Sequence, residues 1–514
     1  MKKIAGSALG AVVVLGALST AGAWYTGQQL PAVLETSIQQ ANQDMSKTLP
    51  ALGLSATIEL VSLERQLFSS NARYRIQFAG SLDGESPSNF EWFVTDRIEH
   101  GPFPLSRLQS LKLLPVMATS NYALERSPEL EKWFAGSQGG APLQGQVSLG
   151  YDRSLSGNLR VQPLQMALDE QTNIDFSGLE IDFDSSANVE KISASGVMDS
   201  FKVTSTLATD ESMRLEFKGM NLTSNTRKGV SDFYLGQNEV RLQQIELQIG
   251  ENAPILFKDF VQRDETSEAN QQLSARYSYD VGMISYQGND IGSSQMLWTV
   301  KNLDAAALQS MVELYGTLLQ SGKVDSESGM PQLTDEQTAQ FKADLEKLLA
   351  GKPGLALEKL AFKTANGESS FSFGLDLDKP VSFDLPAPEL AKQLIAQLDA
   401  KLLVSKAMIT DVIGVQATLA GETDKEAIAQ QAAMVGEMAS GMAVASELAV
   451  LQGEDISSSL HYANDQVTFN GKQMTVDQFV ALAMSSGGGL AGMGHEAPAD
   501  EVLLDESEVE STLQ

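Results

Sequence analysis

The stretch "IDFSGLEIDFD", residues 174–184, sets the pattern on which the fold prediction rests. From Leu179 onward, apolar residues alternate with charged ones. Successive side chains of a β-strand point to opposite faces of the sheet, so this alternation is typical of an antiparallel sheet covered on one face only. The same alternation dominates residues 56–250. The sequence therefore predicts long antiparallel sheets with one apolar face in the N-terminal half.

Gly178 interrupts this alternation, and a second stretch shares the arrangement. "LEFKGMNLTSN", which begins at Leu215, also runs apolar, acidic, Phe, any residue, Gly, apolar, with Gly219 in the place of Gly178. We interpret the two stretches as copies of a strand-bulge-strand unit, in which the glycine lets the strand bend or the hydrophobic phase change. Chance resemblance between β-rich segments explains the likeness almost equally well.

Helical spacing of apolar residues dominates the C-terminal half. One predicted helix covers residues 308–319. The next begins at the capping box Thr334-x-x-Gln337, and the last begins at a similar box at Thr423. Between them, a third predicted helix places four leucines on one face: Leu390, Leu394, Leu398 and Leu402.

Two Asn-Gly pairs predict hairpins between these helices. Asn366-Gly367 and Asn470-Gly471 each suit a two-residue turn that requires positive φ. The expected fold class is therefore α+β, with sheets in the N-terminal half and amphipathic helices and hairpins in the C-terminal half.

The two ends of the chain predict its placement in the cell. Two lysines precede an uncharged run over residues 4–25, which is close to the roughly 20 residues that a membrane-crossing helix needs. We therefore expect a bacterial inner-membrane protein, crossing once, with its bulk in the periplasm. The alternative is secretion to the periplasm after cleavage near Ala23.

The chain is expected to divide into four regions. The membrane anchor is residues 1–27, and a glycine-rich, acidic and disordered tail is residues 485–514. Between them lie a β-rich region, residues 28–300, and a region of helices and hairpins, residues 301–484.

Composition excludes several functions. A net charge of −30 repels nucleic acid, and the absence of cysteine removes thiol nucleophiles, iron–sulfur clusters and cysteine-bound zinc. No phosphate-binding loop, zinc helix or nucleophile elbow is present, so we expect no cofactor, no metal and no catalytic residue. The acidic pairs Asp182 with Asp184 and Asp376 with Asp378 fit solvated strand faces better than a cation site.

The candidate positions are few. His100, Gly101 and Pro102 read as a strand end followed by a turn, with a structural role favoured over catalysis. A long helix after Thr423 is almost free of charge and carries three methionines at a spacing of four: Met434, Met438 and Met442. Such a stripe suits a lipid-facing or dimer-forming surface, but a core helix packed under a sheet is the favoured interpretation.

Four segments resemble the YdgA-like proteins of Gram-negative bacteria, a family without an established function. These segments are "AWYTGQQL" near the N-terminus, "IEHGPFPL" from Ile98, "VKNLDAAAL" from Val300 and "FNGKQM" from Phe469, the last containing Asn470 and Gly471. The resemblance implies an exported or anchored cell-envelope protein that self-associates, and it implies no active site.

Three functions remain open after the sequence is read. The first is a non-enzymatic envelope protein that binds itself, as a homodimer, or another envelope protein. The second is a periplasmic protein that binds or handles lipid on a sheet with one apolar face, in loose similarity to envelope proteins of the AsmA type. The third is a hydrolase without a recognisable motif.

Overall fold

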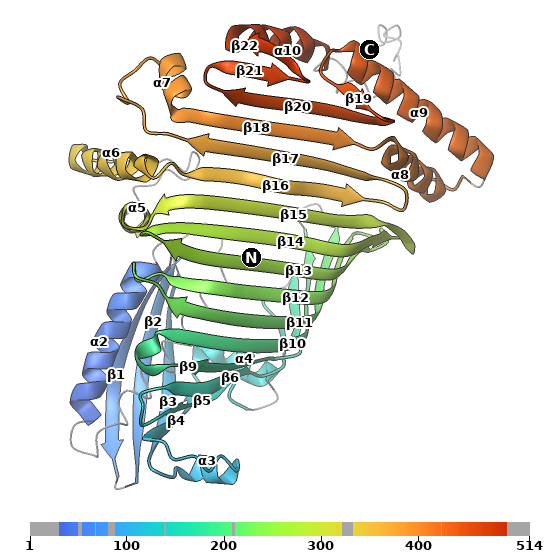
Figure 1. The fold of residues 1–514 in the computed structure, drawn as a ribbon. Coiled ribbons are helices and arrows are strands. Elements are labelled where there is room, and N and C mark those ends of the chain that lie inside the picture. Colours follow the sequence, from blue (N-terminus) through green and yellow to red (C-terminus); the bar gives the residue numbers. More distant parts are fainter. Residues whose placement is uncertain are drawn as a thin grey trace, which may run out of the picture.

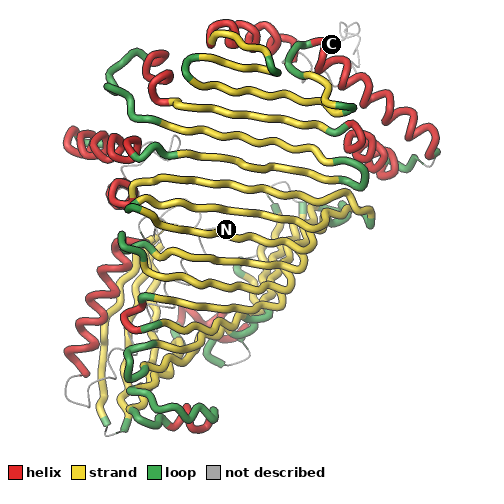
Figure 2. Tube along the Cα trace, viewed as in Figure 1, coloured by secondary structure: helices red, strands yellow, loops and turns green. Residues whose placement is uncertain are grey.

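The computed structural model describes residues 30–49, 54–66, 68–80, 88–137, 140–169, 171–207, 211–320, 333–422 and 424–490. All the strands described there belong to one twisted antiparallel sheet (Figure 1). Helices flank this sheet and connect some of its strands, as the colouring by secondary structure in Figure 2 makes plain. The α+β class is therefore confirmed, and sheet predominates over helix.

The first part of the sheet curls around a hydrophobic core. Helix α2 (Leu30–Thr48) lies along β1 and buries four apolar residues spaced three or four apart, namely Leu34, Ile38, Ala41 and Met45. The strands of this part are β1 (Leu54–Arg65), β2 (Ser69–Gly80), β3 (Ser88–His100), β4 (Ala118–Leu124), β5 (Leu143–Leu149), β6 (Leu155–Val161) and β9 (Leu179–Ser185). Its short helices are α3 (Leu105–Gln109), η3 (Pro128–Leu130), α4 (Glu131–Gly136) and η4 (Ala187–Val189).

Six long strands follow as an antiparallel meander. They are β10 (Lys191–Thr206), β11 (Ser212–Lys228), β12 (Tyr234–Ile249), β13 (Ile255–Ala269), β14 (Gln272–Tyr286) and β15 (Asn289–Asp304). One edge of β10 pairs with β9 and, further along, with β8 (Thr172–Phe176), which forms a hairpin with β7 (Leu164–Ala167). Strand β15 continues past residue 300, so the sheet runs without interruption from the β-rich region into the next.

Helices and shorter strands complete the chain. The helices are α5 (Ala305–Gln320), α6 (Asp335–Ala350), α7 (Ala387–Leu394), α8 (Lys406–Leu419), α9 (Lys425–Ala445) and α10 (Val476–Leu490). The strands are β16 (Gly354–Lys363), β17 (Glu368–Leu377), β18 (Ile395–Val404), β19 (Val450–Gln452), β20 (Asp455–Ala463), β21 (Gln466–Phe469) and β22 (Lys472–Thr475). Both predicted hairpins are confirmed, because β16 pairs with β17 and β21 with β22 across the two Asn-Gly turns.

Two helix predictions need correction. Of the four leucines expected on a third helix, only Leu390 and Leu394 belong to α7, and β18 begins at the next residue. The predicted helix is lost there because β18 pairs with β17 and β20 on its two edges. The capping box at Thr334 is confirmed, but α9 is capped by Asp424, whose carboxylate accepts hydrogen bonds from the amides of Glu426 and Ala427.

A crease crosses the sheet at the glycines that the sequence singled out. Ladder pairing is interrupted along one line that includes Gly178, Gly219 on β11 and Asp259 on β13. All three residues have positive φ, at 100°, 63° and 54°. Apolar positions change phase there: Ile174 and Phe176 precede Gly178, whereas Leu179, Ile181 and Phe183 follow it. Likewise Leu215 and Phe217 precede Gly219, whereas Met220 and Leu222 follow it, so the expected change of hydrophobic phase is present at both glycines.

The predicted membrane placement is corrected. Among the residues that the structure describes, no helix combines the length and the apolar character that a bilayer crossing requires. The segment for which the crossing was predicted, residues 4–25, lies outside those residues. The prediction of an inner-membrane protein held by an N-terminal helix is therefore not supported. Residues 491–514, most of the predicted tail, also lie outside the described chain.

Candidate interaction surfaces

His100 ends β3, as predicted, and the Gly101–Pro102 bond that follows is cis. The Nε2 atom of His100 lies 3.2 Å from the hydroxyl oxygen of Ser70, and its backbone amide donates to the carbonyl of Phe68. Ser70 is completely buried, so its oxygen is closed to a substrate. This arrangement fits the structural role expected of the turn.

Gly101 is where two backbone segments touch. Its amide donates to the carbonyl of Met117 at 2.7 Å, and a Cβ atom at this position would lie 1.9 Å from the carbonyl oxygen of Val116. A side chain would therefore force apart the two ends of the segment between Pro102 and Val116, which a further hydrogen bond closes.

The segment closed in this way is an exposed apolar lobe, residues 103–114, which contains α3. Leu111 is 82% exposed and Leu114 is 78% exposed. The large apolar side chains exposed in this lobe are Phe103, Leu105, Leu108, Leu111, Leu113 and Leu114. Single exposed leucines are ordinary, but a contiguous set of this kind marks a surface that contacts something else.

Buried polar side chains fix the base of the lobe. The carboxylate of Glu99 accepts hydrogen bonds from both the amide and the hydroxyl of Ser106, at the start of α3. The guanidinium of Arg107 is buried and donates to Ser148 on β5 and to the carbonyl of Leu114. Its burial lowers the pKa of Arg107. Hydrogen bonds at the base of the lobe therefore fix the backbone that carries the exposed apolar side chains.

Phenylalanine rings on neighbouring strands contact one another on one side of the crease, edge to face between Phe176 and Phe201 and stacked between Phe201 and Phe217. The ring centroids of Phe176 and Phe201 are 6.0 Å apart, and those of Phe201 and Phe217 are 6.4 Å apart. The register continues this series to Ile245 on β12 and Phe257 on β13, all of them only half-buried.

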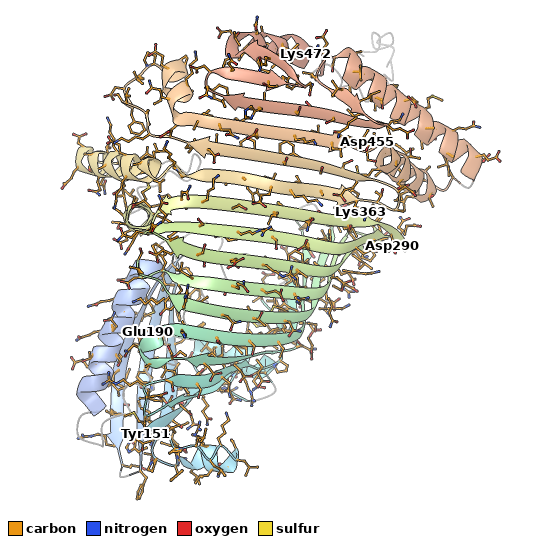
Figure 3. All side chains as sticks on the ribbon, viewed as in Figure 1. Tyr151, Glu190, Asp290, Lys363, Asp455 and Lys472 are labelled. Carbon is orange, nitrogen blue, oxygen red and sulfur yellow. The ribbon has the colours of Figure 1, made fainter. Side chains whose placement is uncertain are left out.

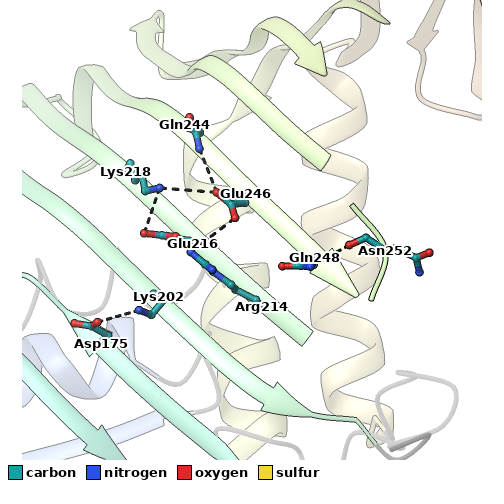
Figure 4. A network of polar contacts seen from close by, with 9 residues as sticks. All are labelled: Asp175, Lys202, Arg214, Glu216, Lys218, Gln244, Glu246, Gln248 and Asn252. Atoms are coloured by element: carbon teal, nitrogen blue, oxygen red, sulfur yellow. Dashed lines mark hydrogen bonds and ion pairs between the residues drawn. The ribbon is translucent and has the colours of Figure 1, made fainter. Parts of the chain in front are cut away.

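Charged side chains occupy the alternate positions of the same strands (Figure 4). Arg214 contacts Glu216 at 2.6 Å, and Lys218 lies 3.4 Å from Glu216 and 3.8 Å from Glu246. Burial opposes ionisation of Glu216, but the Arg214 hydrogen bond and the nearby Lys218 hold its pKa below the ordinary value. Its charge is thus balanced within the ladder, which is the usual form of a structural cross-strand network.

The methionine stripe of α9 faces solvent. Met434 is 69% exposed, Met438 is 59% exposed and Met442 is 44% exposed. Residues on the other side of the helix, including Ala432 and Ser440, are buried where α9 packs on α8. The stripe is therefore not a set of core positions, and the two interaction interpretations stay open.

The remaining candidates have structural partners. Asn470 has φ of 48° and Gly471 has φ of 78°, as the tight turn requires. The Asn470 side chain accepts a hydrogen bond from the amide of Ser459 and donates to the carbonyl of Leu448, which ties the hairpin to β20 and the end of the α9 connection. Both residues serve the fold.

The acidic pairs form no metal site in the described chain. Asp182 and Asp184 are exposed, while Asp376 pairs with Lys301 and Asp378 with Lys352. No group of three metal-binding side chains occurs among the residues that the structure describes.

Asp96 is a buried acid in the N-terminal core that was not predicted from the sequence. Its side chain is 2% exposed and accepts a hydrogen bond from Ser120, and burial raises its pKa to about 7. A signal was present, because Asp96 lies between Val94 and Ile98 on the apolar phase of β3. The exposed leucines of the lobe were not predicted either, because a run of apolar residues in a sequence looks the same whether it is buried by other segments or exposed to solvent.

Comparison with known proteins places the chain among bacterial relatives. It is 26% identical to Protein YdgA of Escherichia coli K12 over 92% of this chain and 95% of the relative. It is 21% identical to the E. coli K12 protein YihF, over 93% and 98% of the two chains. A Haemophilus influenzae protein is 22% identical over 62% of this chain and 87% of its own. A family described as "Bacterial protein of unknown function (DUF945)" matches residues 1–477. The chain therefore belongs to this DUF945 family, the YdgA-like family that its sequence motifs indicated.

Proposed function

We propose that this protein binds an acyl chain of a lipid on one face of its C-terminal sheet, and that its role is binding rather than catalysis. The observation that carries the proposal is a set of three rows of apolar side chains, two of which cross β14 to β20 and one of which crosses β14 to β18. Residues directly opposite each other in an antiparallel pair lie on the same face of a sheet, so each row belongs to one face.

The rows follow from the residue-by-residue pairing of neighbouring strands. The first row is Tyr277, Trp298, Leu357, Phe373, Ala400 and Leu460. The second row is Tyr279, Met296, Leu360, Phe371 and Leu402. The third row is Ala275, Val300, Leu355, Leu375, Leu398 and Tyr462. No charged side chain occurs in these rows, although one residue in five of the chain is charged.

The opposite face of the same strands is largely polar. One of its rows is Arg276, Thr299, Ala356, Gly374, Asp399 and His461. In that row His461 contacts Asp399 at 2.6 Å. This difference between the faces supports the predicted sheet with one apolar face, here in the C-terminal half.

Helices leave the apolar rows open to a ligand. In Figures 1 and 2, α5 and α6 lie beside one end of β15 to β18 and α8 beside the other, and no described helix crosses the middle of these strands. Leu355, Leu360 and Leu402 remain about 40% exposed. Burial of an acyl chain on such a face contributes about 0.8 kcal/mol for each methylene group removed from water.

A series of hydrogen-bonded polar side chains lies next to the apolar rows. It could bind the polar end of an amphiphilic ligand. The Ser224 hydroxyl donates to Asn238 at 2.6 Å, and the Asn238 amide donates to Asp264 at 2.7 Å. Asp264 lies opposite Tyr277, which begins the first row. Burial and the charge of Asp264 raise the pKa of Tyr277. A ligand with an apolar chain and a hydrogen-bonding end therefore fits better than a hydrocarbon.

Mass spectrometry tests the proposal. The full chain is purified without added lipid, recorded natively and recorded again after organic extraction. We expect a stoichiometric lipid on the wild-type chain and its loss from the double variant Phe371→Lys and Phe373→Lys, which places two charges on the apolar face of β17.

The matched control is Ser370→Lys and Ser372→Lys, which adds the same charges to the other face of the same strand. This variant should keep the lipid. A lipid-free wild-type chain, or equal lipid loss from the two variants, would contradict acyl-chain binding on this face. Circular dichroism of both variants checks that the sheet is intact.

A second candidate function is self-association through α9. It is supported by the exposed stripe of Met434, Met438 and Met442, because methionine side chains adapt to irregular apolar partners. The two functions use different surfaces and are tested by separate substitutions.

A further inference from the structure

The apolar lobe, residues 103–114, lies at one extremity of the molecule. Figure 1 places α3 at the end of the sheet farthest from α9 and α10. Phe68 is 78% exposed in the β1–β2 connection and lies beside the lobe, because its carbonyl accepts the hydrogen bond from His100. Tyr151 is also exposed; it lies at the same extremity (Figure 3) and follows β5, whose Ser148 holds Arg107.

The lobe projects from the molecule and is held firmly at its base. The amide of Val116 donates to the carbonyl of Pro102 at 3.0 Å, which closes the segment, and Arg107 crosslinks its two arms. Within the lobe, the amide of Lys112 donates to the carbonyl of Arg107 at 2.9 Å. Leu111, Leu113 and Leu114 thus face solvent on a fixed support, and this arrangement keeps the entropic cost of docking low.

Charge around the lobe differs from the charge of the whole chain. Residues 100–124 contain no aspartate or glutamate, although the chain has 66 acidic residues and a net charge of −30. The charged residues of this segment are Arg107, which is buried, and Lys112, at the exposed tip. Glu99, which precedes this segment, is buried and accepts hydrogen bonds from Ser106 at the base of the lobe. Exposed leucines, aromatic side chains and an exposed lysine form the composition that is typical of the boundary between lipid headgroups and acyl chains.

We propose that this lobe inserts into the interface of a lipid bilayer that contains anionic lipid. Phe68, Leu111, Leu113 and Leu114 enter the boundary between headgroups and acyl chains, and the Lys112 ammonium group meets lipid phosphates. The surface is separate from the apolar rows of β14 to β20 and is independent of the proposed lipid-binding face. It requires no membrane-crossing helix.

A fluorescent probe on the lobe tests the insertion in the full chain. The natural chain has no cysteine, so Leu111→Cys provides a single labelling site for an environment-sensitive dye. The probe partner is a vesicle of phosphatidylcholine and phosphatidylglycerol. On mixing, we expect the emission at position 111 to shift to the blue and to rise at least twofold.

The control carries the same dye at Val381→Cys, an exposed apolar position between β17 and α7 that belongs to none of the proposed surfaces. Its emission should stay unchanged with the same vesicles, which separates insertion of the lobe from attachment by another part of the chain. The variant Lys112→Glu should weaken the response at position 111 with anionic vesicles at least fivefold and leave the response to pure phosphatidylcholine less affected.

An unchanged spectrum at position 111 overturns the proposal, whether or not the protein sediments with the vesicles. The proposal is also overturned if the dye at position 111 responds to a second protein in the absence of vesicles and does not respond to vesicles alone. That result would indicate a protein partner for the lobe. The mass-spectrometry test with the β17 double variant reports only on lipid bound to the sheet face. The dye test reports only on the lobe, so either proposal can fail while the other holds.

Discussion

The carboxyl group of Asp96 is the most strongly perturbed acid in the N-terminal core. It lies opposite Ala72 on β2 and Tyr122 on β4, and one of its oxygens has no hydrogen-bond partner among the described residues. Burial raises its pKa to about 7, so the native state holds this proton at a pH where the unfolded chain has released it. Protonated Asp96 suits the core better than the carboxylate does.

Stability should therefore fall as the pH rises through this range. The unfolded carboxyl titrates near 4 and the native one near 7, so the stabilising protonated form is fully present below the unfolded pKa and is lost as the pH approaches 7. The loss amounts to about 4 kcal/mol. We expect Asp96→Asn to remove this slope and to be more stable than the wild type at pH 8, as measured by urea unfolding at several pH values.

Asp182→Asn is the matched control, because Asp182 is an exposed aspartate of the same sheet. It should keep the wild-type slope. If Asp96→Asn and the wild type lose stability in parallel between pH 4 and pH 7, the carboxyl of Asp96 is not the group responsible.

Gly101 carries a second prediction at this scale. Gly101→Ala sets a methyl group against the carbonyl of Val116, so we expect a loss of about 2 kcal/mol or more in the free energy of urea unfolding. Gly436→Ala on α9 is the control, because its Cβ meets nothing within 4 Å. It should stabilise the chain by about 0.5–1 kcal/mol. Equal effects of the two substitutions would show that close backbone approach at Gly101 is unimportant.

Among the secondary-structure elements, α9 offers the clearest separation of a packed side from a free side. Ala432 and Ser440 are buried, and the methionine stripe is exposed. A substitution on the stripe can therefore change association without disturbing the fold.

Met438→Lys tests the second candidate function. If α9 forms a self-association surface, the added charge should raise the dissociation constant of the dimer at least tenfold in sedimentation velocity. Met484→Lys on α10 is the control, since Met484 is also a highly exposed methionine. A chain that is monomeric before substitution, or that associates equally well with either lysine, would exclude the stripe as a dimer surface.

Local patterns predicted elements well where the local chemistry was decisive. The capping box at Thr334 and the Asn470-Gly471 turn depend on residues within a few positions of each other, and the structure confirms both. At Asn366-Gly367 the predicted hairpin is present, but the two-residue turn with positive φ is not, because residues 364–367 join β16 to β17. The helix expected through Leu398 and Leu402 is wrong, because strand pairing with distant segments decides the conformation there. A spacing of four leucines does not contain that information.

At the scale of the whole molecule, packing is uneven along the sheet. The main hydrophobic core joins α2 to strands up to β10, and its last member along the chain is Ala194. Strands β12 and β13 contribute few buried side chains, and no described helix packs extensively on them. The sequence did not indicate this, because alternation looks the same in a strand that covers a core and in a strand that is open on both faces.

Hydrogen exchange should reveal this difference. We expect backbone amides of β4 and β5 to exchange about tenfold or more slowly than those of β12 and β13, although both pairs form antiparallel ladders within the sheet. Peptides that contain Gln243 or Asp259, where the β12–β13 ladder is interrupted, are left out of the comparison. Mass spectrometry of peptides from each region makes the measurement. Equal protection would mean that the sheet opens as one cooperative unit and that the N-terminal core adds no local stability.

The crease through Gly178, Gly219 and Asp259 has a mechanical consequence. Bending the sheet across its strands would break ladder hydrogen bonds, whereas folding it along this line changes torsion angles where pairing is already interrupted. The sheet should therefore bend more easily along this line than elsewhere, and the parts of the sheet on either side of the line should stay rigid. A change of angle along this line would move Phe176, Phe201 and Phe217 together, without loss of a strand pair.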